Sequence, residues 1–556
     1  MASVFKSASF SRFAPIFAAV LPIWYAPPVR AGAQGQDVPQ SSTLQTDDQR
    51  LNRYYDRQHP VPTEQPTDPL PVVSASAPAA ATPSPQGDDR ARFVLDRVEF
   101  TESALLDLGT LQGAVAPFIS KHVSRDDLIR MLDAVNALYT ARHITTARAV
   151  LQAQAIVHGV VRIELVEGRL SALQVVGARP NHDAFIRRRL RLQLEDIVDS
   201  DRLRQDLVYL NRTSSLSAQA LLRPGDERGQ TDVLIHVNEP KPRSFEGFVD
   251  AGGADSTGRT RVGLQAHLYG LAAADDRLDG NLAHSRGGNS GSVSYSIPVS
   301  SSNSRLGVSY AHSQVNILND AFRELDITGT SSVASLEYRQ PFVATLNWLF
   351  GGIGSYSLTQ SATRISGESI ADTTSRSVTL GLSLEHQGDG QRWSVTQLAT
   401  RLRSDEPLLG KNEFTLVPGS AYYIQRLGRS RLALRADAGW QWSDGKNIPS
   451  ASLFQIGGLG SVRGYERGVL AGPRGYYLDL ELHRTVGERL DLFVFTDYGA
   501  TQGFYPRRNE IVDAGLGTSY QRGWLSVSGD VGSAFNAIVP DQNRLRFNVR
   551  MSIRWN

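Results

Sequence analysis

One glycine-rich segment stands out for the chemistry it could support. It spans residues 454–465, reads FQIGGLGSVRGY and carries Arg463, while a second short motif downstream, FTDYG, contains Asp497. Glycine-rich loops can cradle phosphates, but these glycines lack the required spacing and no strand-to-helix pattern surrounds them. We therefore reject nucleotide binding. A glycine-rich loop with one arginine can instead fold back into a polar cavity, where Arg463 and Asp497 could pair.

Other chemistry is poorly supported by the composition. The chain has no cysteine, its eleven histidines are scattered, and no serine-hydrolase, zinc-protease or nucleotide-loop motif occurs. A formal net charge of +2 gives no case for nucleic acid. The densest basic cluster (Arg187, Arg188, Arg189 and Arg191) is expected to be a solvated helix face. The sequence thus predicts no enzyme activity, no cofactor and no metal site.

The last twelve residues predict a membrane strand. From 545 to 556, apolar and polar residues alternate strictly, so one face is wholly apolar and carries Trp555. The other face carries Arg546, Arg550 and Arg554. A soluble sandwich strand is the alternative. A strand of this length with arginines on its polar face suits lipid outside and a wet lumen inside.

The first residues have the order of a secretory signal peptide. Lys6 and Arg12 precede an apolar stretch at 13–25, and the small residues Ala31-Gly32-Ala33 follow, so we expect a signal peptide at 1–33. No later segment offers about 18 uninterrupted apolar residues. A membrane location would therefore require a barrel.

Residues 34–90 combine a polar helical pattern with a proline-rich stretch. Thr46 and Gln49 have capping-box spacing at the start of a helix without an apolar stripe. Such a helix either plugs a wet cavity or is disordered in isolation, and we assign 34–59 as a plug helix segment. Residues 60–90 hold eight prolines among alanine, serine and threonine, and are expected to be an unfolded linker.

Two similar α+β units follow, over 91–169 and 170–240. The first is expected to contain a strand at 93–100, helices at 103–118 and 124–142, and strands at 145–152 and 158–167. The second repeats this order with a strand at 173–177, helices at 182–194 and 199–211, and strands at 217–222 and 231–238. The repeat predicts two tandem β-α-α-β-β units.

From 241 to 556 the pattern changes to many alternating strands between polar turns, as an all-β barrel requires. Between the apolar positions lie lumen candidates: Arg435, Asp437, Asp479, Glu481 and His483. At about 9–11 residues per membrane strand, the length allows roughly 12 to 18 strands.

These motifs resemble a known family. Val462-Arg463-Gly464-Tyr465 is similar to the loop-tip motif of the outer-membrane assembly superfamily, and Phe495, Asp497 and Gly499 resemble its late-strand motif. The α+β units resemble POTRA domains. Within the first, Leu165-Val166-Glu167-Gly168-Arg169 is similar to the signature of TpsB transporters, the two-partner secretion exporters of haemolysin and filamentous-haemagglutinin type. Departures are His143-Ile144, Gln152 and the final Asn556.

The resemblance implies a transmembrane antiparallel barrel of sixteen strands, with two POTRA domains in the periplasm of a Gram-negative bacterium. It further implies export of a large secreted partner, such as an adhesin, haemolysin or toxin, that docks on the POTRA domains and crosses without nucleotide hydrolysis. The protein is expected to be a monomer placed in outer-membrane lipid by the barrel assembly machinery. A simple porin is a weak alternative, because it would need no soluble repeats. The main alternative is an insertase for other barrel proteins.

Overall fold

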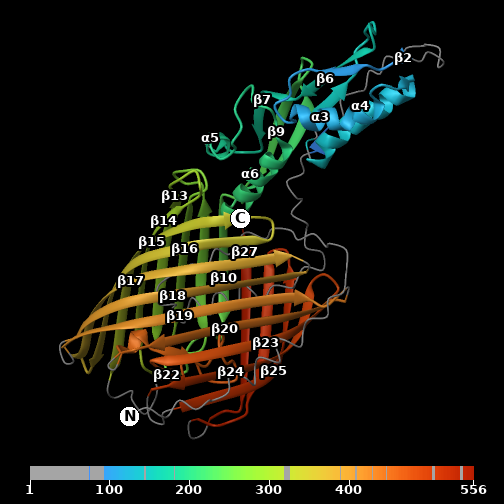
Figure 1. The fold of residues 1–556 in the computed structure, drawn as a ribbon. Coiled ribbons are helices and arrows are strands. Elements are labelled where there is room, and N and C mark those ends of the chain that lie inside the picture. The colour runs from blue at the N-terminus through green and yellow to red at the C-terminus, as the bar shows by residue number, and fades with distance from the viewer. Residues whose placement is uncertain are drawn as a thin grey trace, which may run out of the picture.

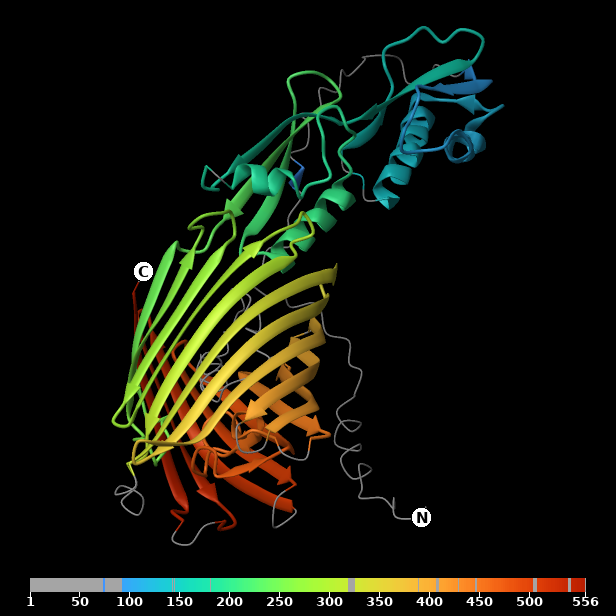
Figure 2. The same cartoon turned by 90° about the vertical axis from the view of Figure 1, so that its left-hand side faces the viewer.

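The structure, a computed structural model, consists of a large barrel with an elongated arm at one end (Figures 1 and 2). It describes residues 74–75, 93–142, 144, 146–180, 182–318, 326–388, 390–406, 410–428, 430–445, 448–503, 508–538 and 542–555. The expected signal peptide and plug helix segment lie outside these residues. No helix in the described part is both long and apolar enough to cross a bilayer.

The outer half of the arm is the first α+β unit. Its elements are β2 (Phe93–Val94), β3 (Arg97–Phe100), α3 (Leu108–Val115), η2 (Ala116–Phe118), β4 (His122–Val123), α4 (Arg125–Ala141), β5 (Ala147–Val150) and β6 (Val160–Glu167). Ser124 and Asp127 form a capping box at the start of α4. The helix expected from 103 begins later because Ser103 and the backbone of Ala104 bond Glu167, and Asp107 caps α3.

The inner half of the arm is the second unit. It contains β7 (Arg169–Val176), α5 (Asp183–Arg187), α6 (Ser200–Thr213), β8 (Ser217–Pro224) and β9 (Gln230–Asn238). The helix predicted over 182–194 is wrong in length, since α5 ends at Arg187. The chain turns there because Leu190 enters the core and Arg191 pairs with Asp206 of α6 at 2.6 Å.

The expected linker is not wholly without structure. Ser74–Ala75 forms strand β1, which pairs in parallel with β8 at the edge of the second unit's sheet, in the order β1-β8-β9-β7. An edge strand presents unpaired N–H and C=O groups that any extended segment can satisfy. Backbone pairing therefore orders two residues that composition alone would leave unfolded.

The barrel closes with sixteen strands, which confirms the expected number. They are β10 (Arg243–Asp250), β11 (Arg261–Tyr269), β12 (Arg277–Ser285), β13 (Gly288–Pro298), β14 (Arg305–Asn316), β15 (Ile327–Ala344), β16 (Trp348–Ile365), β17 (Glu368–Gly388), β18 (Gln391–Glu406), β19 (Gly410–Arg426), β20 (Leu432–Ser443), β23 (Arg474–Val486), β24 (Leu490–Gln502), β25 (Arg508–Arg522), β26 (Leu525–Ala534) and β27 (Leu545–Trp555). All neighbours are antiparallel, and β27 closes on β10.

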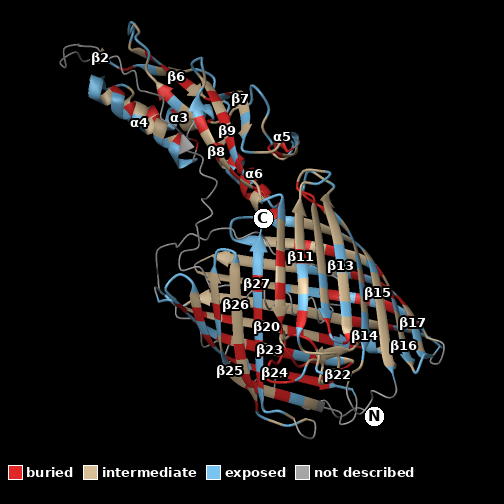
Figure 3. Ribbon diagram, turned by 180° about the vertical axis from the view of Figure 1, so that it is seen from behind, coloured by how far each residue is buried: buried red, intermediate tan, exposed pale blue. Residues whose placement is uncertain are grey.

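Buried and exposed residues alternate along the strands of the wall (Figure 3). On β27, Phe547 is 66% exposed whereas its neighbour Asn548 is 4% exposed. On β17, Leu380 is 68% exposed and Thr379 is 1% exposed. The apolar residues face outward and the polar ones inward, as a barrel in lipid with a polar lumen requires.

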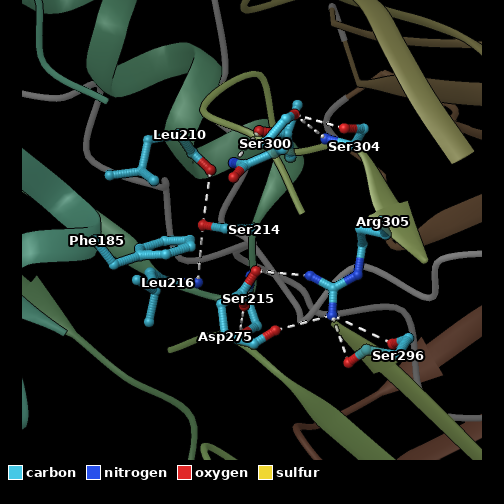
Figure 4. Close-up of polar contacts among 12 residues, drawn as sticks. Phe185, Leu210, Ser214, Ser215, Leu216, Asp275, Ser296, Ser300, Ser304 and Arg305 are labelled. Atoms are coloured by element: carbon cyan, nitrogen blue, oxygen red, sulfur yellow. Dashed lines mark hydrogen bonds and ion pairs between the residues drawn. The ribbon is translucent and has the colours of Figure 1, made fainter. Parts of the chain in front are cut away.

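The second unit is docked on the turns at one end of the barrel (Figure 4). Asp275, in the turn before β12, accepts a bond of 2.9 Å from the backbone N–H of Ser215 and pairs with Arg305 of β14 at 2.7 Å. Asn303 of the next turn donates to Thr213 at 2.7 Å, and Arg212 pairs with Glu385 at 3.0 Å. These contacts fix the arm against the barrel.

The arginine cluster after Phe185 is only in part the solvated helix face that composition favours, because Arg188 and Arg191 are exposed whereas Arg189 is partly buried. Arg189 lies over the Phe185 ring, 3.4 Å from its centroid, and donates to the carbonyl of Ser300 in a barrel turn at 2.7 Å. Burial lowers the pKa of Arg189 to about 10, so it remains charged at neutral pH. Arg189 is held by a tertiary contact, because the barrel turn supplies a carbonyl acceptor that the local sequence cannot reveal.

Candidate functional site

The glycine-rich segment forms the tip of a long loop between β20 and β23 that folds onto the inner wall. Two short paired strands, β21 (Phe454–Ile456) and β22 (Leu470–Gly472), support it. Gly457, Gly458 and Gly460 have φ of 108°, 82° and 93°, a region that side chains rarely adopt. The glycines therefore build a sharp reversal that presents Arg463.

Arg463 is clamped by Asp497 of β24. Its backbone N–H donates to the carboxylate at 3.0 Å, its Nε donates at 2.8 Å and its Nη2 donates at 2.7 Å. Arg463 is 1% exposed and Asp497 is fully buried. The carboxylate thus holds both the main chain and the side chain of the loop tip.

Two further carboxylates complete the shell around the guanidinium. Asp479 and Glu481 of β23 accept bonds from Nη2 and Nη1, respectively. On the opposite side, the guanidinium carbon lies 3.8 Å from the centroid of the Phe495 ring. Glu481 in turn bonds His483 at 2.7 Å. The arginine is therefore held on all sides by two neighbouring strands.

Gly464 brings the loop backbone against the wall. Its N–H donates to Asp513 of β25, and a Cβ on Gly464 would lie 2.8 Å from that of Asp513. A Cβ on Gly532 of β26 would lie 2.9 Å from the Cα of Gly464. Neither position has room for a side chain, so both glycines are needed for this approach.

Val462 and Tyr465 anchor the flanks of the tip. Val462 is fully buried against Gly499, where a Cβ would lie 3.0 Å from a Val462 methyl. The Tyr465 hydroxyl lies 3.0 Å from the Val512 carbonyl oxygen and 2.9 Å from that of Asn536. Each residue of the loop-tip motif therefore has a partner on the inner wall.

The structure brings all the candidate motif residues together, but the sequence had indicated fewer partners. Asp479 and Glu481 were expected in the lumen without a role. Their alternation with outward-facing apolar residues along the strand indicated this position. Asp513 and Asn536 were missed altogether. Asp513 shares inward parity on its strand, but nothing local distinguishes it from other lumen acids.

Chemically, this arrangement holds a loop in place. In the part of the chain that the structure describes, no group of three or more potential metal ligands is placed to hold an ion. Every cationic donor of the tip is already engaged by a wall carboxylate. The site is a clamp that fastens the connection between β20 and β23 to the inner wall.

Ion pairs also bridge the seam where the barrel closes. Six residue pairs join β10 to β27, from Phe245 opposite Trp555 to Asp250 opposite Arg550. Arg550 and Arg554 pair with Glu246 at 3.1 Å and 2.7 Å. The seam is therefore a continuous ladder with charged cross-links on its lumen side.

Comparison with known proteins agrees with this architecture. Residues 229–520 match the family described as haemolysin secretion/activation protein ShlB/FhaC/HecB, and residues 93–168 match the POTRA domain of ShlB type. The chain is 23% identical to the heme/hemopexin transporter protein HuxB of Haemophilus influenzae strain 86-028NP over 468 residues, which is 79% of this chain and 80% of HuxB. It is 24% identical to the outer membrane transporter CdiB of Escherichia coli O6:K15:H31 over 509 residues, covering 84% and 83%.

The fold is also that of a solved structure. CdiB from Escherichia coli superposes with a TM-score of 0.64 at 19% identity, covering 91% of this chain and 97% of that one. A closed barrel with a clamped inward loop and a docked POTRA arm defines the class of outer-membrane barrels that carry POTRA domains. The chain belongs to the haemolysin secretion/activation family ShlB/FhaC/HecB. It is a TpsB transporter of two-partner secretion, located in the outer membrane with its POTRA arm in the periplasm.

Proposed function

We propose that this transporter conducts one unfolded partner, of the adhesin, haemolysin or toxin class, through its lumen, and that the Arg463 clamp sets the working position of the loop. The observation that carries this is the complete enclosure of Arg463 by wall carboxylates at 1% exposure. A charge that is so fully paired has one favourable position, because displacement would leave buried charges unpaired. The loop is thereby held to one side of the lumen.

The POTRA arm is proposed to capture the partner by strand addition. The pairing of β1 with β8 supports this, because that edge accepts an extended segment in parallel register. Main-chain bonds would supply affinity for many sequences, and side-chain pockets would supply selectivity. Because the contacts around Asp275 fix the arm against the barrel, the captured chain would enter the lumen from a constant position.

The seam between β10 and β27 supports export over insertion. An insertase must open its wall to release a client sideways into the bilayer. Opening this wall would break six paired positions and strip Glu246 of both arginines. We therefore expect the partner to leave along the barrel axis, with no nucleotide required.

The proposal also covers the plug segment, the assembly of the barrel and the oligomeric state. Residues 34–59 act as a removable plug, so deleting 34–58 should raise single-channel conductance in planar bilayers. The barrel assembly machinery inserts the protein, which works as a monomer.

Reconstitution tests the proposal directly. The purified chain is placed in proteoliposomes and supplied with the urea-unfolded product of a large secreted-protein gene adjacent to its own. We expect the product to become protease-protected without ATP. Equal protection in liposomes that lack the transporter would refute the proposal.

A further inference from the structure

An apolar groove lies on the outer wall over β23 to β27. It has a volume of about 790 Å³ and is lined mainly by aliphatic and aromatic side chains: Leu482, Leu492, Val494, Leu516, Phe547 and Val549. The lining carries almost no polar surface. These residues are among the exposed large hydrophobics of the wall, so the groove faces the lipid.

The groove exists because one cross-strand row lacks large side chains at its centre. The strand register aligns Leu492 of β24 with Thr518, Thr518 with Gly529, and Gly529 with Val549 of β27. Thr518 is short and Gly529 has no side chain. The outer surface is therefore recessed at these two positions, between the larger side chains of Leu492 and Val549. A Cβ on Gly529 would meet only the Asn548 carbonyl oxygen at 3.4 Å and a Val549 methyl at 4.0 Å.

The same row carries a positive charge near the periplasmic side, between Leu492 and Leu432 of β20. Arg484 is the register partner of Leu492, lies on the outer face and is two residues from the periplasmic end of β23. Arg489 and Trp524 in the adjoining periplasmic turns are exposed, as is Arg522 at the periplasmic end of β25. The N–H of Gln521 donates to the Arg489 carbonyl at 2.9 Å, so the two turns are adjacent. The acid nearest in sequence is Glu488.

We propose that the groove is a binding site for an anionic phospholipid of the inner leaflet of the outer membrane. The acyl chain lies over Thr518 and Gly529, and the headgroup phosphate binds Arg484. An arginine on a lipid-facing wall is costly, by an amount that depends on its depth. A phosphate offers bidentate acceptors that offset this cost, and Arg489 with Arg522 favours a net negative headgroup.

The position gives such a lipid a structural role. The inner faces of the same strands carry Phe495, Asp497 and Asp513, which hold the loop tip. Filling the groove supports the wall directly behind this clamp.

Native mass spectrometry of the full chain tests the site. The protein in detergent is titrated with phosphatidylglycerol or, separately, phosphatidylethanolamine. We expect one tightly retained phosphatidylglycerol, with retention reduced on the order of tenfold by Arg484→Gln, which removes one charged contact. Gly529→Leu, which fills the groove, should reduce it similarly.

Matched controls keep the outcome decisive. Arg376→Gln removes an exposed arginine from β17, and Gly280→Leu adds a side chain on β12 where a Cβ meets nothing within 4 Å. Both controls should retain the lipid as wild type does. Equal retention by all four variants would indicate bulk lipid only and overturn the site. Equal retention of both headgroups would overturn the anionic preference.

Discussion

Arg463 donates to the carboxylate of Asp497 from both its backbone N–H, at 3.0 Å, and its guanidinium, at 2.7 Å. This double contact ties the path of the loop backbone to the identity of one side chain on the wall. Removing the guanidinium leaves the backbone bond but also leaves Asp479 and Glu481 without their common cation. Loss of the Arg463 side chain should therefore change the position of the loop tip more than it changes the stability of the barrel.

The first prediction concerns this pair. Arg463→Ala should abolish secretion while heat-modifiable barrel remains, because breaking a buried pair costs about 3–5 kcal/mol and the transmembrane ladder does not include the loop. Secretion assays with gel-shift analysis measure both effects. Asp497→Ala should behave alike.

The reciprocal variant Arg463→Asp/Asp497→Arg provides the control for the pair. It should recover secretion partly, because the new arginine would still face Asp479 and Glu481. Wild-type secretion by both single variants would show that Arg463 is one lumen arginine among many.

The second prediction concerns the close approach of Gly464 to Gly532. Gly532→Ala should displace the loop tip and reduce secretion severalfold, because the new Cβ would lie 2.9 Å from the Gly464 Cα. Gly280→Ala is the matched control, since its Cβ has open space. Protease accessibility of the loop in purified protein measures the displacement, and identical digestion of both variants would contradict it.

The third prediction concerns the docked arm. Asp275→Ala leaves the Ser215 N–H and the Arg305 guanidinium without their shared acceptor, which should weaken docking by about 1–3 kcal/mol. Because the chain has no cysteine, spin labels can be placed on α6 and on a barrel turn without background. Distance distributions should broaden relative to wild type. An unchanged distribution would mean that other contacts suffice.

Much of the fold could be predicted because it depends on periodicity. The alternation around Phe547 and Leu380 identified membrane strands, and the repeat after residue 91 identified two similar units. Helix ends and the arginine cluster were less predictable. The end of α5 depends on Leu190 and on the Arg191–Asp206 pair within the second unit, whereas the role of Arg189 depends on a barrel turn that lies more than a hundred residues away.

The site was predictable only in part for the same reason. The spacing of the glycines and the parity of Asp497 made an Arg463–Asp497 pair conceivable from sequence. The contributions of Asp513, Gly532 and Asn536 depend on how deeply the loop enters the barrel, which no local pattern encodes.

The partner is proposed to leave through the lumen of a closed barrel, and a covalent bridge across the seam between β10 and β27 tests this path. Val249→Cys/Met551→Cys places thiols on opposite partners of β10 and β27, in a chain with no other cysteine. After a short bifunctional thiol reagent has joined the strands, we expect secretion of the partner at the wild-type rate, as in the Val249→Cys single variant. Loss of secretion on bridging, with recovery when a cleavable bridge is reduced, would mean that the wall must open and would contradict export along the barrel axis.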